Sequence, residues 1–179
     1  RHRDHPRERL RILPPVHHVP IYVAGYRSAV MELAGRKGDG YLARPAESIA
    51  GLRTLLSVMY RAARAAGRDP ESIDVAGYLL ALVDDTRRAA LNRAKREPFV
   101  IYMMSILSDV TLRRAGFETA LRDRIATAWR AEDYTTAGRL VPDELLDAFI
   151  LCGTAAEVAD RVAEYREAGM TLPLLQPVV

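Results

Sequence analysis

The stretch that decides the fold is VPIYVAGYRSAVMELAGRKGDGYLAR, residues 19–44. Residues 28–35 predict one short helix, and a strand follows it at residues 41–44. Before the helix, Gly25 ends a run of alternating apolar residues typical of a buried strand: Val19, Ile21 and Val23. A helix that joins two strands implies that the strands run parallel. The stretch therefore predicts a strand–helix–strand unit whose first strand ends at a candidate binding site.

Two further strands are predicted along the chain. Residues 73–83 are apolar on both faces, as in a strand buried on both sides. Residues 171–176 form a final strand, although Pro173 weakens that assignment. Between the second and third strands, residues 46–66 predict an amphipathic helix. Its apolar residues recur three and four positions apart: Ile49, Leu52, Leu56, Met59 and Ala63.

The long stretch between the third and last strands looks helical, and no confident strand is predicted from residue 84 to residue 169. Asp84, Asp85 and Thr86 predict the start of a helix, because acidic residues are favoured at a helix N-terminus. Thr154 and Glu157 form a capping-box pattern that opens the last helix. The order of elements is β-α-β-α-β, several helices, then β, which predicts the α/β class with a parallel sheet.

Two architectures are compared for this pattern. A dinucleotide-binding Rossmann sheet is disfavoured, because residues 25–30 hold one glycine where its fingerprint needs three. A (β/α)8 barrel typically needs about 250 residues and eight units, whereas this chain supplies four. Half a barrel leaves two open edges. We therefore expect either that another chain covers these edges or that the chain is part of a longer protein.

Composition narrows the class of protein. The 179 residues are 49% hydrophobic and carry a net charge of +3, as in a globular domain. No apolar run approaches the roughly 18 residues that a membrane span needs. The single cysteine, Cys152, excludes an internal disulfide and favours a cytoplasmic location. Residues 1–11 are basic and are interpreted as a linker, with a nucleic-acid-binding arm as the alternative. The chain begins without Met, so we expect it to be processed or part of something longer.

Three stretches carry a resemblance to a known family: VPIYVAGYRSAVMELAGRKGDGYLAR, AARAAGRDPESIDVAGYLLALVDDT and VPDELLDAFILCGTAAEVADRVAEYREAGMTLPLLQPV. In this order they resemble the C-terminal half of the luciferase-like oxidoreductases. The branch that includes methylenetetrahydromethanopterin reductase and F420-dependent glucose-6-phosphate dehydrogenase is the most similar. The match runs from about residue 11 to residue 179. Its most specific parts are Ala34-Gly35, Gly38-Asp39-Gly40, residues 66–70 and Cys152-Gly153-Thr154.

The resemblance implies a (β/α)8 barrel that binds FMN or coenzyme F420. It implies that residues 1–179 form a single partial domain of about four βα units, and that residues 84–150 are a helical insertion before the last strand. The missing N-terminal half carries most of the family's ring contacts, so the catalytic residues stay unknown. The implied activity is that of an oxidoreductase or monooxygenase acting on a small-molecule substrate.

A candidate cofactor site lies where the first strand ends. Gly25, Tyr26, Arg27, Ala29 and Val30 span the strand end and a helix's first turn, whose backbone N–H groups attract anions. Arg27 adds a cation that can pair with a phosphate oxygen. The resemblance implies the same place for the cofactor phosphate. The alternative is that Gly25 only ends the strand and that Arg27 is solvated.

Other candidate residues are less specific. Arg44, at the end of the second strand, matches a position where the family can contact substrate, and a surface arginine is the alternative. His17 and His18 are interpreted as a loop pair, because zinc sites need three or four ligands. Cys152 is interpreted as a buried small residue. No metal site is predicted.

Two functions remain open. The first is one half of an FMN- or F420-dependent oxidoreductase, which forms a homo-oligomer or pairs with a missing N-terminal half. The second is a non-catalytic half-barrel, retained as an interaction module or as a truncated remnant. Nucleic-acid and membrane partners are not expected.

Overall fold

The computed structural model describes residues 17–178, so the predicted linker at residues 1–11 lies outside the described part. Five strands form one sheet. They are β1 (Tyr22–Ala24), β2 (Gly40–Ala43), β3 (Asp74–Val83), β4 (Leu151–Gly153) and β5 (Leu172–Pro177). The four predicted strands are present, with ends that differ from the prediction by at most three residues.

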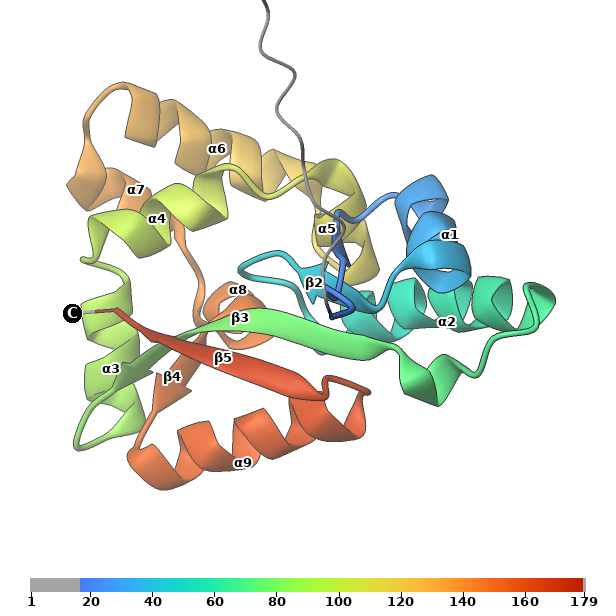
Figure 1. Ribbon diagram of the computed structural model, residues 1–179. Coiled ribbons are helices and arrows are strands. Elements are labelled where there is room, and N and C mark those ends of the chain that lie inside the picture. The colour runs from blue at the N-terminus through green and yellow to red at the C-terminus, as the bar shows by residue number, and fades with distance from the viewer. Residues whose placement is uncertain (1–16, 179) are drawn as a thin grey trace, which may run out of the picture.

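Helices fill the connections between the strands (Figure 1). They are α1 (Ser28–Lys37), α2 (Ile49–Ala65), the 3-10 helix Pro70–Ser72, α3 (Arg87–Ala94), α4 (Pro98–Ser105), α5 (Asp109–Arg114), α6 (Thr119–Arg130), α7 (Tyr134–Leu140), α8 (Asp143–Phe149) and α9 (Ala155–Glu167). The six helices α3 to α8 all lie between β3 and β4. This is the helical stretch that the sequence predicted.

All strand pairs of the sheet are parallel, and β3 is the central strand. On one side, its first four residues pair with β2 and its last three residues pair with β4. On the other side it pairs with β5 over six residues. β1 extends the sheet beyond β2. The predicted α/β class with neighbouring parallel strands is confirmed.

Two hydrophobic cores lie on the two faces of β3, because successive side chains of a strand point to opposite faces. Val75, Leu79 and Ala81 belong to a core with α1, α2 and α9. Leu80 and Leu82 belong to a core built mainly by α3 to α8. Figure 1 shows α9 on one side of the sheet and α4, α6 and α7 on the other. The expected burial of β3 on both faces is confirmed over most of its length.

The glycines and the turn singled out in the sequence hold α1 against α2. A Cβ at Gly35 would lie 2.2 Å from the backbone oxygen of Met59, so glycine lets the two helices approach. Arg68, in the turn after α2, donates from Nη1 to Gly35 O at 2.7 Å and from Nη2 to Gly38 O at 2.7 Å. This arginine therefore satisfies carbonyl groups at the C-terminal end of α1.

Three details of the sequence prediction are wrong. Val19 and Ile21 are not in a buried strand: they precede β1 and are 63% and 65% exposed, because β1 pairs only with β2 among the described residues. The strand β4 was missed. The helix start predicted at residues 84–86 is present, but its cap is the Thr86 side chain, which accepts the hydrogen bond from Ala89 N, and not an aspartate.

The last strand, β5, is an exposed edge within residues 17–178. Leu172, Leu174 and Leu175 are 43%, 37% and 54% exposed. Pro173 lies inside the strand, which is tolerated because β5 pairs only with β3 in the described part. The predicted open edges are thus β1 and β5. No helix of the described residues is long and apolar enough to cross a membrane.

Candidate anion-binding site

The turn between β1 and α1 has a conformation that requires glycine. Gly25 has φ of +152°, which side chains rarely allow, and a Cβ there would lie 2.7 Å from Cγ1 of Val30. The Tyr41 hydroxyl of the adjacent strand β2 donates to Gly25 O at 2.9 Å. Burial raises the pKa of this tyrosine, which therefore stays a neutral donor. The turn is held in a defined shape beside the end of β2.

The N-terminus of α1 has no capping side chain. Five other helices, α2, α3, α5, α7 and α9, begin with a Ser, Thr or Asp side chain that accepts a hydrogen bond from the first turn. The helices α4, α6 and α8 share the uncapped start with α1. In α1 the N-cap residue is Arg27, which makes no such bond, and the first turn holds no acidic residue. The N–H groups of Ser28 and Ala29 consequently lack intrahelical partners at the positive end of the helix dipole.

An open cleft of about 560 Å³ lies between this helix start and α5. Its lining residues are Tyr26, Arg27, Ser28, Ser108, Asp109, Val110 and Arg114. Arg114 is half-buried and donates from Nη1 to Tyr26 O at 3.3 Å. Asp109, the carboxylate of the lining, is engaged by Arg122 at 2.8 Å and by Arg113 at 3.2 Å, and the Arg122 hydrogen bond holds its pKa below the usual range.

Charge in this cleft is therefore dominated by two arginines. Among the ion pairs of residues 17–178, none includes Arg27 or Arg114. Together with the uncapped helix start, they make the cleft chemically suited to a phosphate or another anion. The lining of this cleft contains no Cys or His side chain.

The predicted cofactor-site residues occupy different parts of this geometry. Tyr26 and Arg27 line the cleft, and Gly25 shapes the turn behind it. Ala29 is exposed in the first turn of α1. Val30 packs against the turn at Gly25. The roles of these residues in binding stay predictions.

Arg44 approaches the same turn from β2. Its guanidinium carbon lies 5.0 Å from the centre of the Tyr26 ring, within the range of a cation–π interaction. Its Nε lies 3.6 Å from Oε2 of Glu47. The predicted substrate-contacting arginine and the predicted phosphate turn are thus neighbours.

Sequence reasoning missed Ser108 and Arg114. Both belong to the helical stretch between β3 and β4, more than 75 positions after the turn that they face. No local motif marks them. The signal that could have found them is the Ser108 N-cap pattern, which places a helix start there but does not say what it faces.

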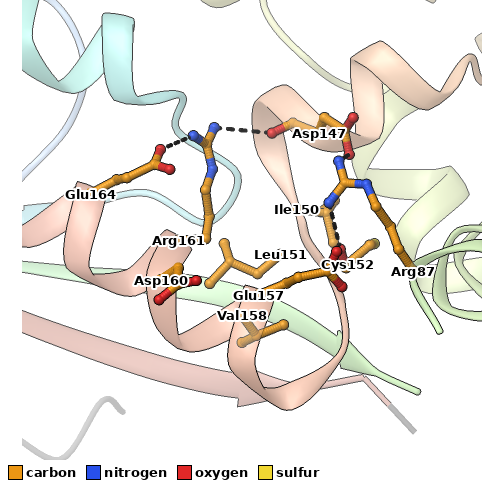
Figure 2. A pocket seen from close by; sticks show the side chains of 10 residues that line it. All are labelled: Arg87, Asp147, Ile150, Leu151, Cys152, Glu157, Val158, Asp160, Arg161 and Glu164. Carbon is orange, nitrogen blue, oxygen red and sulfur yellow. Dashed lines mark hydrogen bonds and ion pairs between the residues drawn. The ribbon is translucent and has the colours of Figure 1, made fainter. Parts of the chain in front are cut away.

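A second pocket, of about 340 Å³, lies between α3, α8, β4 and α9 and is charged, and both of its arginines have protein partners (Figure 2). Arg87 pairs with Asp147 at 2.6 Å and donates to Cys152 O at 3.2 Å. Arg161 pairs with Glu164 and donates to Asp147 O at 3.1 Å. Because both arginines already have protein partners, we interpret this pocket as a network that joins helices.

The remaining candidate residues form no site. Cys152 is buried, as predicted, and burial raises the pKa of its thiol to about 12, so it stays a protonated thiol. His18 pairs with Asp39, Nε2 to Oδ1, at 3.1 Å. Within residues 17–178, no three His, Cys, Asp or Glu side chains are grouped so as to hold a metal ion.

The chain is similar in sequence to known oxidoreductases. The chain is 30% identical over 154 residues to 5,10-methylenetetrahydromethanopterin reductase of Methanolobus tindarius, covering 86% of this chain and 46% of that protein. It is 40% identical over 78 residues to F420-dependent hydroxymycolic acid dehydrogenase of Mycobacterium tuberculosis, covering 44% of this chain and 20% of that one.

A solved structure agrees with these sequence matches. It is the coenzyme F420 dependent tetrahydromethanopterin reductase of Methanopyrus kandleri, with a TM-score of 0.78 and 26% identity, covering 89% of this chain and 45% of that one. The fold is consistent with half of a (β/α)8 barrel, and the chain spans about half the length of the curated reductases it matches. The sequence profile described as luciferase-like monooxygenase matches residues 1–172, so the chain belongs to the luciferase-like monooxygenase family.

Proposed function

We propose that this chain forms the phosphate-binding half of an oxidoreductase that uses coenzyme F420 or FMN for hydride transfer. The observation that carries the proposal is the uncapped start of α1 beside Arg27 and Arg114, in a member of this family. Both cofactors carry a phosphate, and the cleft offers backbone N–H groups and two cations without carboxylate partners. The residues present therefore fit that part of either cofactor.

Each residue has a separate task in this proposal. The N–H groups of Ser28 and Ala29 donate to phosphate oxygens, and Gly25 lets the backbone come close. Arg27 and Arg114 supply positive charge from the two sides of the cleft. When bound, the cofactor supplies the hydride chemistry, while the protein binds and orients it.

The names of the relatives favour F420 over FMN. The Methanopyrus kandleri structure and the Mycobacterium tuberculosis dehydrogenase are both described as F420 dependent. Arg44 is proposed to contact an anionic group of a small-molecule substrate, since it lies next to the phosphate turn and keeps 22% of its side chain exposed. FMN remains the alternative that the same titration tests.

The ring-binding part of the pocket requires the other half of a barrel. We propose that four further strands meet the open edges β1 and β5, and that residues 84–150 act as an insertion in the complete barrel. The second candidate function is a non-catalytic half-barrel that associates with another protein. The exposed leucines of β5 favour association, and they are compatible with both functions.

The phosphate assignment is tested in a polypeptide that joins a family N-terminal half to this chain. Arg27→Glu replaces a pairing cation by a repelling anion, and a charged hydrogen bond is worth roughly 1.5–3 kcal/mol. We expect the dissociation constants for F420 and FMN, measured by fluorescence titration, to rise by roughly tenfold to a hundredfold. Arg61→Glu, an exposed change on α2, is the matched control and should have no such effect.

Two results would contradict the proposal. Unchanged affinity in Arg27→Glu removes this residue from the site. Tight binding of the intact cofactor by the 179-residue chain alone would overturn the view that the pocket is shared with another half. In the proposal, this chain supplies only the residues that bind the phosphate end of the cofactor.

A further inference from the structure

The carboxylate of Glu47 is buried without a hydrogen-bond partner. Glu47 follows the end of β2 and is 2% exposed. Neither Oε1 nor Oε2 has a hydrogen-bond partner among residues 17–178. A buried carboxylate in this state is costly, because it loses hydration without a compensating bond. The burial of this carboxylate therefore calls for a structural or functional explanation.

The surrounding backbone holds this carboxylate in place. Ala46 has φ of +55°, a left-handed conformation that is unusual for a residue other than glycine. The hydroxyl of the buried Tyr165 on α9 donates to the backbone oxygen of Glu47 at 2.7 Å. A Cβ at Gly51 would lie 2.1 Å from Oε1, so the glycine leaves room for the carboxylate. The strained backbone at Ala46, the hydrogen bond from Tyr165 and the space at Gly51 therefore all act at the same residue, Glu47.

Glu47 faces one cation closely, and this cation is Arg44. Oε2 lies 3.6 Å from Nε of Arg44, which is itself buried without a hydrogen-bond partner. The guanidinium group is also held over the ring of Tyr26, the residue between Gly25 and Arg27. Arg44 is thus fixed on two sides, by a buried anion at its inner nitrogen and by an aromatic face.

We propose that Glu47 is a positioning residue, which holds the Arg44 guanidinium over Tyr26 with its outer nitrogens directed toward an anionic group of the substrate. This proposal rests on the proposed function for the role of Arg44 toward substrate, but the coupling of Glu47 to Arg44 does not. Glu47 itself cannot touch substrate in this arrangement, since both of its oxygens are buried.

A purely structural role explains the geometry less well. Replacing a buried ion pair by neutral groups is often neutral or stabilising, so a 3.6 Å pair with no hydrogen bond contributes little to folding. In contrast, fixing a flexible arginine before the ligand arrives lowers the entropic cost of binding. The arrangement is therefore better suited to preorganising Arg44 than to stabilising the fold.

The coupling makes Arg44 sensitive to the protonation of Glu47. The titratable groups that face this carboxylate are Arg44, Arg114 from α5, Tyr41 of β2 and Tyr165 of α9. Burial raises the pKa of Glu47, and the charges of Arg44 and Arg114, together with the nearby backbone N–H of Ser48, oppose the rise. Once Glu47 is protonated, the anion that holds Nε of Arg44 is lost.

The test follows the Nε–H signal of Arg44 by NMR in the 179-residue chain with labelled arginine, with the signal assigned through Arg44→Lys. We expect it to shift with pH, with a midpoint above that of an ordinary glutamic acid. Glu47→Gln should abolish this shift and leave unchanged the signals of arginines that do not face Glu47, such as Arg64 on α2. Glu118→Gln, at an exposed position outside the site, is the matched control and should preserve the shift.

A second measurement does not depend on signal quality. Phenylglyoxal modifies accessible arginines, and the extent at Arg44 is read by peptide mass spectrometry. Glu47→Gln should speed modification of Arg44 relative to Arg64 in the same sample, and Glu118→Gln should not. An Arg44 signal and reactivity that are unchanged in Glu47→Gln would overturn the proposal. Neither measurement uses cofactor, so failure of the proposed function alone would leave both results as expected.

Discussion

At the scale of single residues, the sequence predicts some backbone features, such as the glycine at a strand end, and does not predict others. Gly25 was predictable, because a glycine after alternating apolar residues marks a strand end, and its φ of +152° explains the choice. Glu47 was not predictable. It reads as a polar residue before a helix, and neither the positive φ of Ala46 nor the space that Gly51 leaves for its carboxylate is visible in the sequence.

Gly25→Ala is expected to destabilise the chain more than Gly67→Ala. Both residues have a positive φ, so both changes carry a backbone cost of order 1–3 kcal/mol. A Cβ at Gly25 also meets Cγ1 of Val30 at 2.7 Å, whereas one at Gly67 meets nothing within 4 Å. Urea unfolding of the two variants measures the difference. An equal loss of unfolding free energy in both variants would show that the Val30 side chain moves aside at little cost.

Glu47→Gln is expected to stabilise the chain at pH 7 or leave it unchanged. Burial raises the pKa of Glu47, so the folded state binds this proton more tightly than the unfolded state. Stability then falls as pH rises from the unfolded pKa through the raised folded pKa, and glutamine removes this dependence. Thermal unfolding from pH 4 to pH 8 should show the variant gaining over the native chain with rising pH. A loss of stability at pH 7 would indicate a stabilising ion pair.

At the scale of elements, local signals predict helix starts well and tertiary neighbours poorly. Thr154 and Glu157 form the predicted capping box, because both partners lie within one turn. The strand β4 was missed since three residues are too short for a period of two to show, and its pairing with β3 decides it. Arg114 was missed because α5 meets the β1–α1 turn only through the fold.

Arg114→Gln is expected to weaken cofactor binding in the joined polypeptide, by less than Arg27→Glu does. The change removes one cation from the cleft without adding an anion, and it weakens the bond from α5 to Tyr26 O. Arg64→Gln is the matched control, because it removes an exposed arginine of α2 that does not line the cleft. Equal effects of the two changes in fluorescence titration would argue for a general charge effect.

At the scale of the whole molecule, the parallel order of strands was predictable from the alternation of strands and helices, and the half-barrel from the count of units. The sequence does not predict what pairs with the two open edges, because an edge strand carries no local signal for its partner. The exposure of Leu172 and Leu174 on one face of β5, and of Leu175 on the other, follows from this open edge.

The 179-residue chain alone is expected to self-associate through β5. An edge strand with unpaired backbone groups and exposed leucines on both faces is a template for pairing with another copy. Leu175 pairs in register with Leu79 of β3 and is 54% exposed, more than Leu172 or Leu174, so it is the residue to replace. Leu175→Lys should shift the chain toward monomer in sedimentation velocity, because a lysine at an edge disfavours strand addition. Leu33→Lys, at 47% exposure on α1, makes the same change away from the sheet and should leave association unaltered. A stable monomer at all concentrations in the native chain would count against an open edge that needs a partner.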